Sequence, residues 1–199
     1  LYPGELQPDE VVGGCIAIYE NVWKNPQRTI EQVEASCSDS DSGIYWQKAE
    51  TIGQGAMQNA RTNDMCNITY LAEVTNNPLM QNIHNQFYVS LLAASIPYAN
   101  RFELNEEMFH EPYSLLRYGE SQEYKCHYDG YTEIARVISA LCYLNDDYEG
   151  GELEFPHFGI KIKPQAGMLI LFPSNFAYSH IAHPVTNGTK YTMVTWIKD

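Results

Sequence analysis

Short β-type segments separated by turn residues fill the chain from about Glu111 to its end, and this pattern constrains the fold most strongly. Apolar, aromatic and β-branched residues make up the segments, and the Gly, Pro, Asn and Asp residues between them supply turn conformations. Since no helical pattern interrupts the series, it predicts a jelly roll, in which antiparallel sheets pack together. The eight segments are PYSLLRY, EYKCHYD, ARVISALCYLN, GELEFP, GIKIK, GMLILFP, YSHIAHPV and KYTMVTWI.

The first 110 residues have a more mixed pattern. Residues 11–22 (VVGGCIAIYENV) are apolar and β-branched and predict an early strand, and residues 66–71 predict another. Pro26 and Pro78 each stand where a helix can begin. The segments that start there, PQRTIEQVEASC and PLMQNIHNQFYVSLLAAS, place apolar residues at helical spacing and predict two helices.

We therefore predict one domain, mainly β with α, in which helices and strands of residues 1–110 support a jelly roll over residues 111–199. A length of 199 residues is enough for a single domain with a sizeable core. The aromatic share of 13 %, with 15 tyrosines, favours a β-rich fold with aromatic-lined clefts.

The chain is acidic, since 25 Asp and Glu residues against 12 Lys and Arg residues give a formal net charge of −13. Such a charge opposes nonspecific binding to nucleic acid and to anionic membrane surfaces. It could attract a basic protein, but solubility is the simpler interpretation. No apolar run is long enough to cross a membrane. We therefore expect neither a nucleic-acid partner nor a membrane partner.

The cysteines predict a reducing compartment, and we expect free thiols and a cytoplasmic location. Their number is odd and no C-x-x-C pair occurs, which argues against a disulfide framework or a zinc site. The first residues, LYPGELQPDE, are acidic and lack the basic segment of a signal peptide. The five cysteines are Cys15, Cys37, Cys66, Cys126 and Cys142.

His127 and Asp129 stand two residues apart in EYKCHYD. Residues at this spacing point to the same face of a strand, so both can reach inward. Two imidazoles and one carboxylate can hold one face of an Fe(II) ion and leave other positions open. His180 in YSHIAHPV is the candidate second imidazole, because a return between the sheets would place it opposite the pair. Taken alone, the H-x-D triplet fits a structural strand histidine better.

The remaining histidines point less clearly to a metal. His183 lies three residues from His180 and would face the other side of a regular strand, so the two are not expected to bind one ion. His84, His110 and His157 lack partners at a suggestive spacing, and we expect them to be structural or exposed.

Lys190 begins the segment KYTMVTWI, one strand beyond His180. This segment is apolar at alternate positions, so a lysine that points inward needs an anionic partner. The ammonium group could hold the distal carboxylate of a dicarboxylate whose other end chelates the metal. The alternative is an ordinary solvated lysine.

Several motifs follow one another in a familiar order and spacing: LRYGESQEYKCHYD, RVISALCYLND, GGELEFP, GMLILFP and H-x-x-x-PV-x-x-G-x-KY ending in TW. Through them residues 113–196 resemble the prolyl 4-hydroxylase type of 2-oxoglutarate- and Fe(II)-dependent dioxygenase. That family has a double-stranded β-helix (jelly roll) core. The N-terminal half agrees with it only in general layout.

The resemblance implies Fe(II), 2-oxoglutarate and O2 as the metal, the cosubstrate and the oxidant, with ascorbate as a candidate reductant. It makes the chain a single dioxygenase domain whose catalytic jelly roll spans residues 111–199. It also implies that iron is ligated by His127, Asp129 and His180, and that Lys190 pairs with the C5 carboxylate of 2-oxoglutarate.

Three further residues match functional positions of the family. Tyr118 matches a tyrosine that lines the cosubstrate pocket, and Tyr143 matches one that hydrogen-bonds the C5 carboxylate in some members. Arg136 falls where relatives place an arginine near the substrate entrance. Strand packing for Tyr143 and a surface charge for Arg136 are the alternatives.

The sequence departs from the family at three positions. Gly130 and Tyr131 follow the triplet where many relatives have an aromatic residue directly after the aspartate. His183 stands where the family more often has a small or acidic residue. None of the three belongs to the ligand set, but each could alter the substrate groove.

The implied reaction is hydroxylation of a prolyl residue in a peptide or protein, of the procollagen-proline dioxygenase type, with release of succinate and CO2. Asp129 favours hydroxylation over halogenation, because a halogenase needs that ligand position vacant for halide. A proline-rich substrate would lie in a groove beside the iron, covered by a mobile loop for which residues 37–61 are the candidate. Trp46 and Arg61 are candidates to line this groove. An ordinary surface loop is the alternative.

Three other functions stay open. The same chemistry on a small molecule or on another residue, such as lysine, would differ only in the groove. A nucleic-acid demethylase would share the iron centre, but the net charge of −13 and the lack of a basic stripe oppose it. A jelly-roll interaction module with a structural metal, or with none, would need neither an open metal face nor a buried cation.

Overall fold

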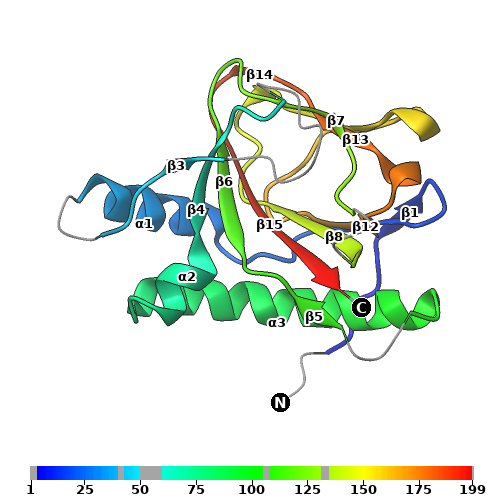
Figure 1. Cartoon of the computed structure of the whole chain (residues 1–199), viewed down its shortest axis with the longest axis horizontal. Coiled ribbons are helices and arrows are strands. Elements are labelled where there is room, and N and C mark those ends of the chain that lie inside the picture. Colours follow the sequence, from blue (N-terminus) through cyan, green and yellow to red (C-terminus); the bar gives the residue numbers. More distant parts are fainter. Residues whose placement is uncertain (1–3, 40–42, 50–59, 105–107, 131–134, 199) are drawn as a thin grey trace.

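The computed structural model describes residues 4–39, 43–49, 60–104, 108–130 and 135–198. Within these residues the main layer is an antiparallel sheet of nine strands in the order β1-β2-β12-β8-β15-β6-β4-β3, with β5 paired to one end of β15. A smaller sheet has the order β11-β10-β13-β7, and β14 pairs with β9. Figure 1 shows the strands of the smaller sheet on one side of the main sheet and α3 on the other. The expected jelly roll with helical support is thus confirmed.

Both halves of the chain contribute to the main sheet. The C-terminal half supplies β5 (Phe109–His110), β6 (Ser114–Tyr118), β8 (Arg136–Tyr143), β12 (Leu169–Pro173) and β15 (Lys190–Lys198). The N-terminal half adds β1 (Glu10–Val12), β2 (Ile16–Tyr19), β3 (Gln47–Lys48) and β4 (Asp64–Asn67) at the two edges.

The smaller strands come from the C-terminal half alone. They are β7 (Tyr124–His127), β9 (Glu149–Gly150), β10 (Leu153–Phe155), β11 (Ile160–Ile162), β13 (His180–Ala182) and β14 (Val185–Asn187). Short 3-10 helices, η1 (Pro156–Phe158) and η2 (Phe176–Tyr178), connect some of them. Each of the eight predicted β-type segments therefore contains a strand.

Both predicted helices are present, as α1 (Pro26–Ser38) and α3 (Pro78–Arg101), and α2 (Ile68–Glu73) lies between them. α3 begins where expected, because the Asn77 side chain accepts hydrogen bonds from two backbone N–H groups of its first turn. It continues past the predicted segment and through Pro97. Tyr98 is buried there, and its hydroxyl donates to the Cys15 carbonyl at 2.7 Å, so tertiary contacts extend the helix.

The alternation of side chains along the central strands separates two sides of the main sheet. On β8, Ile138 and Ala140 pack with α3 residues such as Phe87 in the largest hydrophobic cluster. Leu141 and Tyr143 point to the other side, toward the smaller strands. The helices thus support one face of the sheet and leave the other face for a cavity.

Two predictions for the N-terminal half were wrong in detail. The expected strand over residues 11–22 is a hairpin, because Gly13 and Gly14 adopt φ values of 55° and 80° and turn the chain between β1 and β2. The expected strand over residues 66–71 is mostly helical. It changes from β4 to α2 at Asn67, whose side chain accepts a hydrogen bond from Tyr70 N–H and caps the helix.

All five cysteines lie in the described residues, and each is a free thiol. Cys126 is exposed, whereas Cys66 and Cys142 are buried in the core. In the described part of the chain, helices long and apolar enough to cross a membrane are absent.

Candidate iron and cosubstrate site

The three predicted metal ligands meet at one point. His127 ends β7, Asp129 follows two residues later, and His180 begins β13 directly opposite His127 in the ladder. One ligand atom from each residue lies within 4.8 Å of the others. Nε2 of His127 and Nε2 of His180 lie 3.6 and 3.7 Å from the Asp129 carboxylate oxygens. Two imidazoles and a carboxylate are a donor set that suits Fe(II).

Backbone carbonyls fix the tautomers of both histidines. Nδ1 of His127 lies 2.7 Å from the Lys125 oxygen, and Nδ1 of His180 lies 3.1 Å from the Tyr178 oxygen. A carbonyl can only accept a hydrogen bond, so Nδ1 must carry the proton in each ring. The unprotonated Nε2 atoms therefore point toward Asp129, as metal ligation requires.

The charge states also suit a metal. Burial, together with the neighbouring His127, lowers the pKa of His180 to about 4, so this ring is neutral at pH 7. Burial opposes ionisation of Asp129, but His180, His127 and a hydrogen bond from Ser139 outweigh it and hold the pKa of the carboxyl well below its usual range. Because His180 is neutral at pH 7 and neither Nε2 atom carries a proton, we attribute the ionised state there mainly to the hydrogen bond from Ser139.

Gly130 is explained by its surroundings. Its N–H donates to the Ser174 carbonyl at 2.7 Å. A Cβ at this position would lie 3.1 Å from the Ser174 oxygen and 3.2 Å from the Arg136 oxygen. The departure from the family at this position thus reflects close backbone packing beside the triad. The second departure, Tyr131, lies outside the described residues.

Lys190 is buried in the wall of the same cavity, with 2 % of its surface exposed. Its Nζ donates to the Gly151 carbonyl at 3.0 Å and lies 4.4 Å from the centre of the Tyr118 ring. Burial, with a smaller contribution from Lys163, lowers its pKa to about 7. Among the described residues no carboxylate lies within ion-pair distance of Lys190. A buried ammonium in this situation calls for an anionic ligand.

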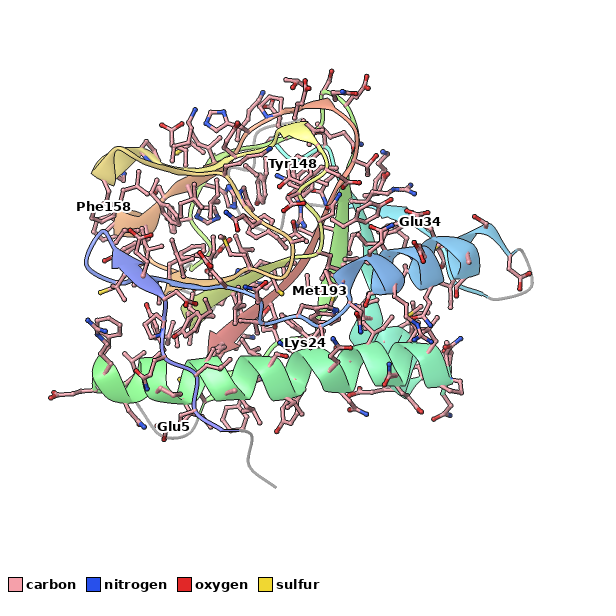
Figure 2. The ribbon with its side chains drawn as sticks, turned by 180° about the vertical axis from the view of Figure 1, so that it is seen from behind. Glu5, Lys24, Glu34, Tyr148, Phe158 and Met193 are labelled. Carbon is pink, nitrogen blue, oxygen red and sulfur yellow. The ribbon has the colours of Figure 1, made fainter. Side chains whose placement is uncertain are left out.

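Two buried hydroxyls near Lys190 also lack hydrogen-bond partners among the described residues, namely Thr192 Oγ1 and Tyr148 Oη. Thr192 follows Lys190 by two residues on the same face of β15 and lines the cavity. The Tyr148 ring packs beside Lys190 across Gly151. The Lys190 ammonium and the unpaired Thr192 hydroxyl, which both line the cavity, fit the distal carboxylate of 2-oxoglutarate. Figure 2 shows Tyr148 on the side of the main sheet away from α3, whereas Met193, next to Thr192, lies toward α3.

The cavity that joins these groups has a volume of about 480 Å³. On β15 its wall consists of alternate residues, Lys190, Thr192, Val194 and Trp196. Tyr118 and Tyr143, both predicted to contact the cosubstrate, line the cavity as well. The structure therefore brings the predicted triad, Lys190 and both tyrosines to one chamber.

Arg136 lines the same cavity near the triad. Its guanidinium binds both carboxylate oxygens of Glu111 at 2.6 and 2.9 Å, donates to the Asp129 backbone oxygen at 3.2 Å, and lies 3.7 Å from the centre of the Trp196 ring. The side chain is thus part of the cavity wall. The buried Nε1 of Trp196 has no hydrogen-bond partner among the described residues.

The other predicted groove residues lie in different places. Arg61 lines the cavity, with its guanidinium 5.2 Å from the centre of the Tyr124 ring. Trp46 lies outside the cavity lining: its indole donates to Glu34 of α1 and packs against Tyr191. The expectation that Trp46 lines the groove does not match this position. The predicted lid, residues 37–61, falls partly outside the described residues.

No sequence pattern pointed to Tyr124, which stacks on the imidazole of His127. In a regular strand, residues three apart face opposite sides. The pairing shifts between His180 and Ala182, which oppose His127 and Tyr124, so β7 has one residue more than β13 over this stretch. This β-bulge turns Tyr124 to the same face as the metal ligand.

The remaining histidines do not join the triad. His183 lies 2.5 Å from Glu154 and outside the cavity lining. His110 bonds the Tyr113 hydroxyl at 2.8 Å, and His84 packs on the same ring. These contacts agree with the structural roles expected for His84 and His110.

The fold and this site together define a jelly-roll protein of the non-haem iron oxygenase type. The family model of the 2OG-Fe(II) oxygenase superfamily matches residues 113–198. Over these residues the chain is similar to that superfamily, whose metal is Fe(II) and whose cosubstrate is 2-oxoglutarate, and the donor set described above fits both.

Curated relatives are similar to the chain in sequence, and solved structures are similar to it in fold. "Probable prolyl 4-hydroxylase 9" of Arabidopsis thaliana is 34 % identical, over 45 % of this chain and 41 % of the relative. Prolyl 4-hydroxylase 13 of the same plant is 30 % identical, over 56 % of this chain and 50 % of the relative. The chain thus spans about half the length of these relatives.

Among solved structures, the fold resembles a viral collagen prolyl hydroxylase from Paramecium bursaria Chlorella virus-1 in complex with 2OG. The TM-score is 0.65 at 19 % identity, covering 94 % of this chain and 97 % of that one. A prolyl hydroxylase from Trichoplax adhaerens, in complex with a hypoxia inducible factor oxygen degradation domain peptide fragment, matches with a TM-score of 0.73 at 18 % identity. The match covers 94 % of this chain and 84 % of that one. At these identities the likeness establishes the fold.

Proposed function

We propose that this protein is a 2-oxoglutarate- and Fe(II)-dependent dioxygenase that hydroxylates a prolyl residue of a peptide or protein, with release of succinate and CO2. One observation carries the proposal: the wall of a single cavity holds an open-faced His127/Asp129/His180 triad and also the buried ammonium of Lys190, which has no carboxylate partner among the described residues. A structural metal site would need neither the open face nor the buried cation.

Each of the cavity residues would have a separate role in binding the metal or the cosubstrate. His127, Asp129 and His180 would hold the metal through two Nε2 atoms and a carboxylate oxygen, each already in the required protonation state. When bound, Fe(II) and 2-oxoglutarate supply the activation of O2, while the protein provides orientation and exclusion of water. Lys190 would bind the distal carboxylate, which keeps the ammonium protonated. The Thr192 hydroxyl can donate to the same carboxylate.

The prolyl substrate is supported by the cavity wall near the triad. Tyr124, Tyr128 and Trp196 supply aromatic faces there, which suit the apolar pyrrolidine ring. The Nε1 of Trp196 can donate to a peptide carbonyl, since none of the described residues accepts from it. The prolyl hydroxylases among the similar proteins, one of them in complex with a peptide, favour a peptide substrate, and we propose the procollagen-proline type for it.

The proposal is tested in two steps. Purified protein is incubated without oxygen with Fe(II) and 2-oxoglutarate, and the visible charge-transfer band of the chelate is recorded. We expect a band in the native protein and none in His180→Ala. His183→Ala, which removes a histidine outside the cavity, is the matched control and should keep the band. A native protein without the band would refute the oxygenase function.

Proline-rich peptides are then incubated aerobically with the complete enzyme and searched for the mass of one added oxygen. Hydroxylated proline, found together with succinate in equal amount, would support the prolyl substrate. Oxidation of lysine, of free amino acids or of a small molecule, with no reaction on proline, would retain the oxygenase and reject the prolyl assignment.

A further inference from the structure

Two buried serines lie behind Asp129. Ser139 is in the middle of β8 and Ser174 follows β12, and the exposed fraction is 0 % for Ser139 and 1 % for Ser174. Ser139 Oγ lies 2.6 Å from Asp129 Oδ2 and 2.8 Å from Ser174 Oγ. The three side chains therefore form a continuous hydrogen-bonded chain that ends on the predicted metal ligand.

The chemistry of the three groups fixes the direction of these hydrogen bonds. An ionised carboxylate only accepts, so Ser139 must donate its single hydroxyl proton to Asp129. Ser139 then has only acceptor sites left, and Ser174 must donate to it. The hydrogen bonds therefore all point in one direction, from Ser174 through Ser139 to Asp129.

Backbone hydrogen bonds hold this chain in place. The N–H of Gly130 donates to the Ser174 carbonyl at 2.7 Å, and the N–H of Ser174 donates to the Val137 carbonyl at 3.0 Å. The residue after Asp129 and the residue two before Ser139 are thus both attached to Ser174. A shift of Ser174 would move both partners of the Asp129 hydrogen bond.

We propose that Ser139 and Ser174 are positioning residues for the metal. Their hydrogen bonds end on Oδ2 of Asp129 and so hold the carboxylate in one orientation. In this orientation Oδ1 is the oxygen available to the metal. The inference rests on the proposed function only in that the triad must bind a metal. It does not depend on which molecule is oxidised.

A purely structural role for the serines makes a different prediction. Loss of the Ser139 hydroxyl leaves a buried carboxylate with one hydrogen bond fewer, which lowers stability with or without metal. A positioning role predicts a loss of metal affinity beyond this effect. Outer hydrogen-bond partners of metal ligands typically contribute about 10–100-fold in affinity.

The test is a titration of the metal-free protein with Co(II), whose visible spectrum reports the ligand set, with thermal unfolding of the same samples. Ser139→Ala should weaken Co(II) binding about 10–100-fold. Ser139→Thr, which keeps a hydroxyl on the same carbon, should restore most of the affinity. Ser95→Ala removes a buried serine of α3 outside the cavity lining and should bind Co(II) like the native protein.

A double variant tests whether the two serines act on Co(II) affinity through the same series of hydrogen bonds. Ser174→Ala should weaken Co(II) binding less than Ser139→Ala, and it should cause no further loss in the Ser139→Ala background, because Ser174 acts through Ser139. Native affinity in Ser139→Ala, or additive losses in the double variant, would overturn the inference. If Ser139→Ala does not fold, Ser174→Ala is the deciding variant. A native Co(II) affinity in Ser174→Ala would then overturn the inference. A native protein that binds no Co(II) would overturn the proposed metal site itself. Failure of the proposed function can thus be told apart from failure of the positioning role.

Discussion

Tyr124 stacks on His127 with ring centroids 3.4 Å apart and ring planes 13° apart. The contact exists because the β-bulge in β7 brings residues three apart to one face. The guanidinium of Arg61 lies on the tyrosine ring in turn. A predicted metal ligand is thus held by a hydrogen bond at Nδ1 and by an aromatic face, which limits rotation of the imidazole.

Tyr124→Ala should therefore weaken metal binding, whereas Tyr124→Phe should not. An aromatic pair contributes about 0.5–1.5 kcal/mol, so the expected loss of Co(II) affinity in the alanine variant is at most about tenfold. Calorimetric titration of the metal-free proteins measures it. The phenylalanine variant is the matched control, because it keeps the ring. Equal affinities in all three proteins would show that the stack does not orient His127.

Thr192→Val should have opposite effects on stability and on cosubstrate binding. The hydroxyl is buried without a partner among the described residues, so its removal should stabilise the ligand-free protein by about 1 kcal/mol. The same change should weaken 2-oxoglutarate binding about 5–10-fold if the hydroxyl donates to the distal carboxylate. Urea unfolding and a binding titration on the Mn(II)-loaded protein give the two values.

Thr195→Val is the matched control for this experiment. Its hydroxyl donates to the Glu111 carbonyl at 2.8 Å, and Thr195 does not line the cavity. This variant should lose stability and keep its affinity for 2-oxoglutarate. An unchanged affinity of Thr192→Val for 2-oxoglutarate would show that Thr192 is not part of the cosubstrate site.

Lys190 should make the stability of the ligand-free protein depend on pH. Its pKa is about 7 in the folded protein, against 10.5 for an unperturbed lysine. Between these values the unfolded chain binds more protons at this site, so the free energy of unfolding should rise with pH, by up to about 1.4 kcal/mol per pH unit from this group. Urea unfolding at pH 7, 8 and 9 measures the slope. Lys190→Met should lack this contribution, and parallel curves for the two proteins would contradict the lowered pKa.

Binding of 2-oxoglutarate should restore the charge of Lys190. A carboxylate beside the ammonium raises its pKa again, so binding near pH 8 should take up a proton. Calorimetry of the Mn(II)-loaded protein in buffers of different ionisation enthalpy detects this uptake. Lys190→Met should bind 2-oxoglutarate at least about 100-fold more weakly, in line with the loss of a buried charge-assisted hydrogen bond. Lys161→Met, at an exposed lysine of β11, should bind normally.

Gly130→Ala should destabilise the protein beside the triad. The added Cβ would lie within 3.2 Å of two backbone oxygens, neither of which belongs to a flexible side chain. Overpacking of this kind typically costs about 1–3 kcal/mol and should lower Tm by several degrees. Gly119→Ala is the matched control, because its Cβ would meet only the Gln122 side chain, at 3.7 Å. Equal Tm values in both variants would show that the backbone around Gly130 can shift to accommodate the added Cβ.

The fold class and the chemical groups of the site could be predicted from the order of residues along the chain. The β-type segments gave the strands of the jelly roll, because turn residues and period-two alternation are local properties. The spacing of His127 and Asp129 gave two ligands on one side, and the apolar neighbours of Lys190 required an anionic partner for it. The position of His180 in YSHIAHPV made it the candidate third ligand, and the family resemblance supplied the cosubstrate.

Which side chains meet across strands could not be predicted in this way, because it depends on the folded arrangement. The stack of Tyr124 on His127 depends on a bulge, and the hydrogen bond from Ser139 to Asp129 joins a strand of the main sheet to the residues that follow β7 in the smaller sheet. Trp46 was expected in the groove but packs against α1, because Glu34 provides its hydrogen-bond acceptor. Local periodicity determines the face on which a residue lies. The partner on that face is set by pairing between segments distant in the chain.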